Sequence, residues 1–379
     1  MNTLLRPYRN GGKKMSEQLI VPWDLDGTLE DDFFVPEYIV DMAQIVLTHY
    51  DLKVSHLEVI TTKADKGGLI WKMDTDKGPF SLKILHRRPG RSQFSLGAQE
   101  YLVKEKEARV PSLYQTKTGE NYVEMGGKLW FVAEWVEPLY PVANDLEGAK
   151  LLCHALGEFH RLSKGYIPPK GSENPTRLHR WPKSYEKIVK KMDWFRKLAT
   201  LYPDMPASKA ILTHVDMFEQ QAKDALDQLI QSSYYELAAR GNTAWGLVHQ
   251  DYGWSNGQMG PNGMWIIDLD GVAYDLPIRD LRKLITGQMD DMGVWDVTWM
   301  KGMVEAYHDA NPIEDALFEI LLIDMSLPNE FYKNVKEMVY EPTVFLDNEV
   351  EALCNRIAES DKSKWPAIEE LRQWKGVKS

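Results

Sequence analysis

Three polar residues in the second half of the chain are spaced as a phosphoryl-transfer site would need them. Asp251 is followed five residues later by Asn256 and, twelve residues after that, by Asp268, which ends the apolar run at 264–267. Phosphoryl transfer needs a carboxylate that orients the acceptor hydroxyl and oxygen ligands that hold Mg²⁺. Asp251 can supply the carboxylate, and Asn256 and Asp268 can supply the ligands. A hairpin turn at 260–263, GPNG, would fold Asp268 back beside Asn256.

The four residues that begin at Asp268, DLDG, also occur at 24–27, where the sequence continues as DLDGTL. This first copy matches the loop of a haloacid-dehalogenase-type phosphatase, whose two aspartates act as nucleophile and as acid/base. Two features oppose that interpretation. Pro22 removes a ladder donor from the preceding strand, and residues 51–136 have the pattern of hairpins, whereas the phosphatase fold needs a parallel sheet. We therefore expect the first copy to form a surface turn.

The elements that must position these residues begin with a small lobe. We expect residues 1–34 to form a polar N-terminal arm and residues 35–137 to form an antiparallel sheet with one helix against it. Apolar residues at helical spacing predict helices, and β-branched and aromatic runs bounded by turn residues predict strands. In chain order these are a helix at 35–50, strands at 54–62 and 69–85 with a hairpin turn at 76–78, a helix at 92–106, and strands at 122–125 and 128–135.

A larger, mainly helical lobe is expected over 138–379, after a linker at 138–141, PLYP. In this part the apolar period changes from 2 to 3.6. The spacing predicts helices over 146–163, 184–201 and 208–239. Because this lobe carries all three polar residues of the phosphoryl-transfer motif, we expect it to hold the catalytic and acceptor-binding groups.

The motif and its surroundings resemble a known family. The segment HQDYGWSN at 249–256 resembles the H-G-D-x-x-x-x-N loop of the aminoglycoside and choline phosphotransferase-like kinases, and IDLD at 267–270 resembles the strand end that follows it. Within that group, AQEYL at 98–102 and DLPIRDL at 275–281 are similar to the CotS-type spore coat proteins. One position departs from the family, because Gln250 stands where the loop usually has glycine.

The resemblance extends over about 35–345 and implies an α+β fold of the bilobal protein-kinase-like type. It implies ATP (or GTP) and Mg²⁺ as cofactors and a small hydroxyl-bearing molecule as acceptor. Asp251 would act on the acceptor, and His249 would brace the catalytic loop through hydrogen bonds. Asn256 and Asp268 would hold the metal. Asp270 could contact a second metal ion, or it could only cap the turn that follows it.

A phosphate-binding cation is expected in the first lobe. Lys83 lies in the middle of a strand among apolar residues, where a lysine is normally unfavourable, and this is the position of the kinase strand lysine. Such a lysine needs an acid from the next helix, and Glu100 shares a helix face with Leu96 and Val103. The alternative is that Lys83 points outward at a sheet edge and Glu100 is solvated.

Two further segments could bind the nucleotide. Gly67 and Gly68 lie between the first two strands, where a kinase covers the phosphates, although a pair of glycines is also typical of an ordinary hairpin turn. Glu134 and Trp135 end the last strand of the small lobe, so their backbone groups could bind adenine. They could equally form only a linker.

The acceptor is less well defined by the sequence. One set of acidic and aromatic residues could form a pocket for a cationic or sugar-like hydroxyl compound. The same residues could instead be core tryptophans and a solvated acidic turn. A different class of function is also open: a structural or interaction component of the spore coat, with other coat proteins as partners. The candidate acceptor residues are Trp254, Asp290, Asp291, Trp295 and Trp299.

Composition argues against several classes of protein. Lys and Arg number 45 against 56 Asp and Glu, a net charge of −11, so nucleic acid is not an expected partner. Because no run of about 18 apolar residues occurs, we expect no membrane span, and the N-terminal residues lack the apolar segment of a signal peptide. Cys153 and Cys354 are far apart in the sequence, which argues against a disulfide scaffold or a zinc site. We expect a cytoplasmic protein, or one deposited from the cytoplasm in the spore coat.

Overall fold

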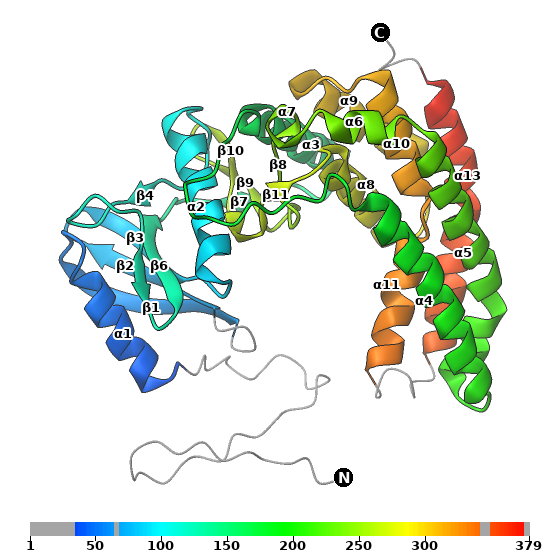
Figure 1. Ribbon diagram of the computed structural model, residues 1–379, viewed down its shortest axis with the longest axis horizontal. Coiled ribbons are helices and arrows are strands. Elements are labelled where there is room, and N and C mark those ends of the chain that lie inside the picture. The colour runs from blue at the N-terminus through cyan, green and yellow to red at the C-terminus, as the bar shows by residue number, and fades with distance from the viewer. Residues whose placement is uncertain (1–34, 64–67, 342–348, 375–379) are drawn as a thin grey trace.

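The computed structural model describes residues 35–63, 68–341 and 349–374, and these residues form two lobes (Figure 1). The first DLDG copy, at 24–27, lies outside the described residues. The predicted α+β bilobal fold is confirmed, since an antiparallel sheet fills one lobe and helices make up most of the other. No helix among the described residues has the length and apolar character needed to cross a membrane.

The first lobe is an antiparallel sheet with a helix on each face. Its elements are α1 (Glu37–Leu47), β1 (Val54–Lys63), β2 (Gly68–Thr75), β3 (Gly78–Ile84), α2 (Pro89–Lys104), β4 (Leu113–Tyr114), β5 (Val123–Met125) and β6 (Lys128–Glu134). The strands lie in the order β1–β2–β3–β6–β4. Strand β5 pairs with the first residues of β6, 128–130. Helix α1 packs on one face of the sheet, and α2 packs on the other.

Strand β3 directs Lys83 toward the α2 side of the sheet. Leu82 and Ile84 are buried in the cluster of side chains that includes α1. Because successive residues of a strand point to opposite faces, Lys83 emerges on the other face, where Leu85 packs near Leu96 of α2. Lys83 therefore points toward the second lobe and not toward the solvent at a sheet edge.

The second lobe surrounds two small β-structures with helices. Its elements are β7 (Tyr140–Pro141), α3 (Leu146–Ser163), α4 (Trp181–Leu201), α5 (Pro206–Gln231), α6 (Tyr234–Ala239), α7 (Asn242–Trp245), β8 (Leu247–Val248), β9 (Gly257–Gly260), β10 (Gly263–Ile266), the 3₁₀ turn η1 (Leu269–Gly271), β11 (Ala273–Tyr274), α8 (Ile278–Met292), α9 (Val297–Ala310), α10 (Asp315–Ser326), α11 (Asn329–Tyr340) and α13 (Val350–Gln373). Strand β7 pairs with the β9–β10 hairpin, and β8 pairs with β11. Helices α4, α5, α11 and α13 form a long arm at the side away from the sheet (Figure 1).

The single helix predicted over 208–239 is wrong, because the structure divides it into α5 and α6. Ser232 adopts an extended backbone conformation, and its hydroxyl accepts a hydrogen bond from Tyr234 N at 3.2 Å. A serine side chain that binds a nearby backbone N–H competes with the helical hydrogen bond. The break lets the ring of Tyr234 pack 5.8 Å from that of Trp181 on α4.

The arm contains a buried ion pair. Lys364 on α13 is 2% exposed and pairs with Asp361 one turn earlier. Gln221 of α5 completes the contact, because its Nε2 donates to Asp361 and its Oε1 accepts from Lys364 Nζ at 3.0 Å. A buried charge is tolerated when it is paired and hydrogen-bonded. This group of three side chains therefore ties α13 to α5.

Replacing Asp361 by Asn should lower the free energy of unfolding by about 3–5 kcal/mol, because the Lys364 ammonium would lose its counter-charge in a buried site. Burial already lowers the pKa of Lys364 below 10.5, so the folded state binds fewer protons than the unfolded state and the deficit should shrink as the pH rises toward that value. Urea unfolding at several pH values measures both effects. The matched control is Glu359→Gln, which breaks the exposed Lys362–Glu359 pair of the same helix. An equal loss in the two variants would contradict the argument.

Candidate active site

Lys83 connects the two lobes through a pair of carboxylates. Its Nζ lies 2.5 Å from Asp268 Oδ1 and 2.8 Å from Asp270 Oδ2, at the start of η1. Burial alone would lower the pKa of Lys83, but the charges of Asp270 and Asp268 raise it above its usual value. Lys83 is therefore an ammonium ion held between two carboxylates of the other lobe.

The predicted contact between Lys83 and Glu100 is absent in the structure. Glu100 instead binds Lys104 one turn later, at 2.6 Å, and accepts a hydrogen bond from Asn121 Nδ2 at 2.6 Å. Asp268 and Asp270 satisfy the lysine. The spacing of Glu100 with Leu96 and Val103 predicted which face of α2 it lies on. Spacing within one helix could not predict how far Glu100 lies from Lys83 on β3.

The β9–β10 hairpin brings the ends of the phosphoryl-transfer motif together as the GPNG turn predicts. Asn256 O accepts a hydrogen bond from Ile267 N at 3.0 Å, directly before Asp268. Asn256 is 9% exposed, and its Nδ2 donates to Asp251 O at 2.6 Å. That bond leaves the amide oxygen Oδ1 as the atom that can bind a cation. The Asp251 side chain is exposed at the surface of the same loop.

The catalytic loop, residues 249–256, is fixed in position by hydrogen bonds to Asp280 of α8. This buried carboxylate accepts hydrogen bonds from the backbone N–H groups of His249, at 2.5 Å, and Gln250, at 3.1 Å. His160 approaches the same carboxylate at 3.4 Å. Burial would raise the pKa of Asp280, but the hydrogen bond from His160 and the surrounding positive charges lower it. Asp280 therefore ties α8 to the catalytic loop.

His249 lies inside this arrangement. The ring is fully buried, its Nε2 lies 2.9 Å from Ile267 O, and it contacts the ring of Tyr252. Because Ile267 O is a hydrogen-bond acceptor, Nε2 carries the proton. The histidine thus joins the catalytic loop to the strand end before Asp268, which suits a bracing role.

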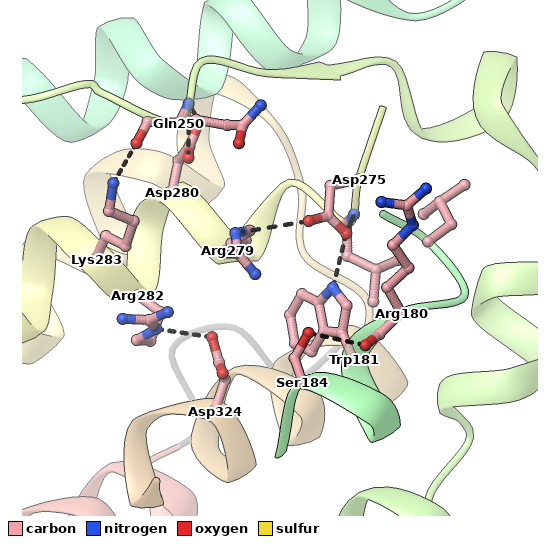
Figure 2. A network of polar contacts seen from close by, with 12 residues as sticks. Arg180, Trp181, Ser184, Gln250, Asp275, Arg279, Asp280, Arg282, Lys283 and Asp324 are labelled. Atoms are coloured by element: carbon pink, nitrogen blue, oxygen red, sulfur yellow. Dashed lines mark hydrogen bonds and ion pairs between the residues drawn. The ribbon is translucent and has the colours of Figure 1, made fainter. Parts of the chain in front are cut away.

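Helix α8 is anchored by further charged contacts (Figure 2). Arg279 Nε lies 3.6 Å from Asp275, whose other oxygen accepts from Trp181 Nε1 at 2.7 Å. Arg282 Nε pairs with Asp324 of α10 at 2.7 Å. One turn after Arg279, Lys283 Nζ donates to Gln250 O. The first turns of α8 therefore fix both the catalytic loop and the surrounding helices.

Two residues outside the predicted site contact the segment 268–271, which contains Asp268 and Asp270 and is called the metal loop. Gln250 Nε2 and Arg91 Nη2 both donate to Gly271 O, the latter at 2.9 Å. A signal for Gln250 was visible in the sequence, because this residue departs from the glycine of the resembling family. Arg91 gave none, since one arginine in the first turn of a helix is an ordinary surface pattern.

Of the four residues in the two further segments predicted to bind the nucleotide, Gly68, Glu134 and Trp135 lie in the described part of the structure. Gly67 lies outside the described residues, and Gly68 begins β2. The backbone N–H of Glu134 donates to Ser112 O at 2.9 Å, and that of Trp135 donates to Pro79 O at 3.3 Å. These two donors are therefore occupied by the protein, so adenine could contact only the carbonyl groups of the pair. A pocket is lined by Gly68, Leu69, Ile70, Lys83, Ile84, His86 and Asp270.

The candidate acceptor residues do not form one group. Asp290 and Trp295 line a shared pocket among α8, α11 and α13, and Glu330 supplies a further carboxyl group there. Burial and the neighbouring Asp290 raise the pKa of Glu330. Trp254 and Trp299 pack against the core of the second lobe, and Asp291 is exposed.

One curated protein is similar to this chain over most of its length. No protein-family model matches the chain. Spore coat protein S of Bacillus subtilis (strain 168) is 29% identical over 286 residues, which cover 76% of this chain and 81% of that protein.

Two solved phosphotransferases share the fold of this chain. An aminoglycoside phosphotransferase from Alicyclobacillus acidocaldarius superposes with a TM-score of 0.71 at 14% identity, over 92% of this chain and 98% of its own. An amicoumacin kinase in complex with AMP-PNP, Ca²⁺ and Ami superposes with a TM-score of 0.56 at 13% identity, over 89% and 97% of the two chains. The chain is thus similar in sequence to spore coat protein S, and its bilobal fold is shared with an aminoglycoside phosphotransferase.

Proposed function

We propose that this protein transfers the terminal phosphoryl group of ATP (or GTP) to a hydroxyl group of a small molecule, with Mg²⁺ as cofactor. The observation that carries the proposal is the convergence of Lys83, from the sheet, on Asp268 and Asp270, from the second lobe. A strand lysine, two carboxylates and a nearby amide oxygen are the groups that phosphoryl transfer requires.

The donor set of the metal loop suits Mg²⁺, which prefers hard oxygen ligands. Asp268 and the Oδ1 atom of Asn256 would hold the ion, and Asp270 lies beside them. When bound, Mg²⁺ would neutralise charge on the phosphate groups. Lys83 would then exchange its contacts with the carboxylates for contacts with phosphate oxygens, keeping its ammonium paired throughout.

In this proposal Asp251 acts on the acceptor. Its backbone is fixed, because Asn256 binds its carbonyl and Asp280 binds the two preceding residues, whereas its carboxylate is exposed. A carboxylate on a fixed loop can orient a hydroxyl group and take its proton as the new bond to phosphorus forms. The pocket with Asp290, Glu330 and Trp295 is a candidate for binding other parts of the acceptor.

A second candidate function is supported by the relative. Spore coat protein S is a spore coat component by name, so this protein could act in the coat chiefly through contacts with other coat proteins and with little turnover. A purely structural component has no reason to bind nucleotide with Mg²⁺. Nucleotide binding therefore separates the two functions.

Lys83→Ala and Asp268→Asn should each weaken Mg²⁺-dependent binding of a nonhydrolysable ATP analogue by about tenfold or more. The first removes the cation on the phosphates, and the second removes a metal ligand. Titration calorimetry with and without Mg²⁺ measures the affinities. Glu100→Gln is the matched control, because Glu100 contacts Lys104 and Asn121 and should leave binding unchanged. Equal affinities in wild type and all three variants would refute the site.

Asp251→Asn should abolish phosphoryl transfer, or the slow background hydrolysis of ATP, while nucleotide affinity stays close to that of wild type. The reason is that Asp251 acts on the acceptor side. Steady-state ATP consumption and calorimetry on the same preparations give the two readouts. Asp24→Asn, in the first DLDG copy, should change neither. If the wild type consumed no ATP but hydrolysed a phosphate monoester, and Asp24→Asn lost that activity, the phosphatase interpretation would replace ours.

A further inference from the structure

The carbonyl oxygen of Gly271 is the point where three segments of the site meet. It belongs to the metal loop, directly after Asp270, and it accepts hydrogen bonds from Gln250 of the catalytic loop and from Arg91 of α2. Arg91 Nη2 also donates to the next carbonyl, that of Val272. The catalytic loop, the metal loop and the helix of the first lobe are thus joined through one peptide group.

Gln250 is aimed at this carbonyl by its own backbone. Its φ is +75°, a left-handed conformation that glycine adopts at little cost and that other residues adopt only when neighbours enforce it. Asp280 binds its N–H and Lys283 binds its carbonyl, and in Figure 2 the side chain extends away from Lys283. Only the amide nitrogen can donate to a carbonyl oxygen, so the partner sets the orientation of the amide group.

Arg91 gives α2 a link to the site that does not involve Lys83. The side chain is 7% exposed and its guanidinium lies 5.3 Å from the centre of the Phe94 ring. Burial and the neighbouring charge of Arg87 lower the pKa of Arg91 to about 10. A charged group is held in such a place when its hydrogen bonds are good, and here they go to the Gly271 and Val272 carbonyls.

The metal loop leaves little freedom at this point. A Cβ atom on Gly271 would lie 2.9 Å from His249 O, so only glycine lets the two loops approach this closely. Asp268 has a φ of +59°, and Asp270 follows within the same short 3₁₀ turn. Gly271 directly follows Asp270 in this turn, so a displacement of the Gly271 backbone would also displace Asp270.

We infer that Gln250 and Arg91 are positioning residues, which hold the Gly271 peptide so that Asp268 and Asp270 point toward the metal and nucleotide. Gln250 and Arg91 connect α2 to the metal loop. An ion pair between Lys83 and an acid on α2 would make a similar connection, but this chain lacks that ion pair among its described residues. The inference rests on the proposed function. It also gives a role to the glutamine that replaces the family's glycine.

The first test uses three substitutions of Gln250. Gln250→Ala and Gln250→Glu remove the donor, the latter with nearly the same shape, and should each weaken Mg²⁺-dependent nucleotide binding about tenfold. Gln250→Gly should weaken binding as much as Gln250→Ala, yet have the higher melting temperature of the two, because glycine suits the positive φ. Calorimetry and thermal unfolding supply the readouts. Unchanged affinity, or affinity that only follows melting temperature across the series, would overturn the inference.

The second test needs no ligand. Gln250→Ala and Arg91→Gln remove two donors to one oxygen, so their effects on unfolding should be non-additive in a double-mutant cycle. Arg88→Gln is the control, because its side chain is 83% exposed and pairs only with Glu173; its effect should add to that of Gln250→Ala. If the effects of Gln250→Ala and Arg91→Gln were as additive as those of Gln250→Ala and Arg88→Gln, Gln250 and Arg91 would not be coupled through the Gly271 carbonyl.

The two tests separate failure of the inference from failure of the proposed function. If the wild type binds no nucleotide in the presence of Mg²⁺, the proposed function fails, and the cycle alone decides whether Gln250 and Arg91 share the carbonyl. If the wild type binds nucleotide and Arg91→Gln binds it equally well, the proposed function stands and the positioning role is refuted.

Discussion

The site depends on the compensation of one buried ammonium ion. Lys83 leaves the sheet on its inner face and is 11% exposed, so its charge would be costly without a partner. The partners, Asp268 and Asp270, belong to the other lobe. The same contact therefore stabilises the docking of the lobes and assembles the groups that would bind phosphate and metal.

A second buried charge explains why the catalytic loop has a fixed shape. Asp280 is 2% exposed and is satisfied mainly by backbone N–H groups of the loop, not by a neighbouring arginine. Arg279 and Arg282, which flank it in sequence, bind Asp275 and Asp324 instead. Arg279, Asp280 and Arg282 at the start of α8 thus bind different partners, and Asp280 binds the loop that contains Asp251.

Local sequence patterns predicted the elements well, because period and turn chemistry act over a few residues. Helix α3 and the hairpins at 76–78 and 260–263 lie where the pattern placed them. The failures involve contacts between distant segments, in one case together with a local serine hydrogen bond. The break at Ser232 lets a tyrosine pack against α4, and the absence of a Lys83–Glu100 contact follows from the position of α2 along the sheet. The role of Arg91 likewise needs a loop 180 residues away.

The two DLDG copies show why a short motif does not determine a site by itself. At 268–271 the surroundings constrain three of the four positions: Lys83 binds both aspartates, and the close approach of His249 O requires the glycine. Gln250 and Arg91 then hold that glycine's carbonyl. Four residues of sequence specify only the side chains. The hairpin, the helix and the opposite lobe specify where the side chains point, and these constraints give residues 268–271 a fixed arrangement that the four-residue motif alone does not specify.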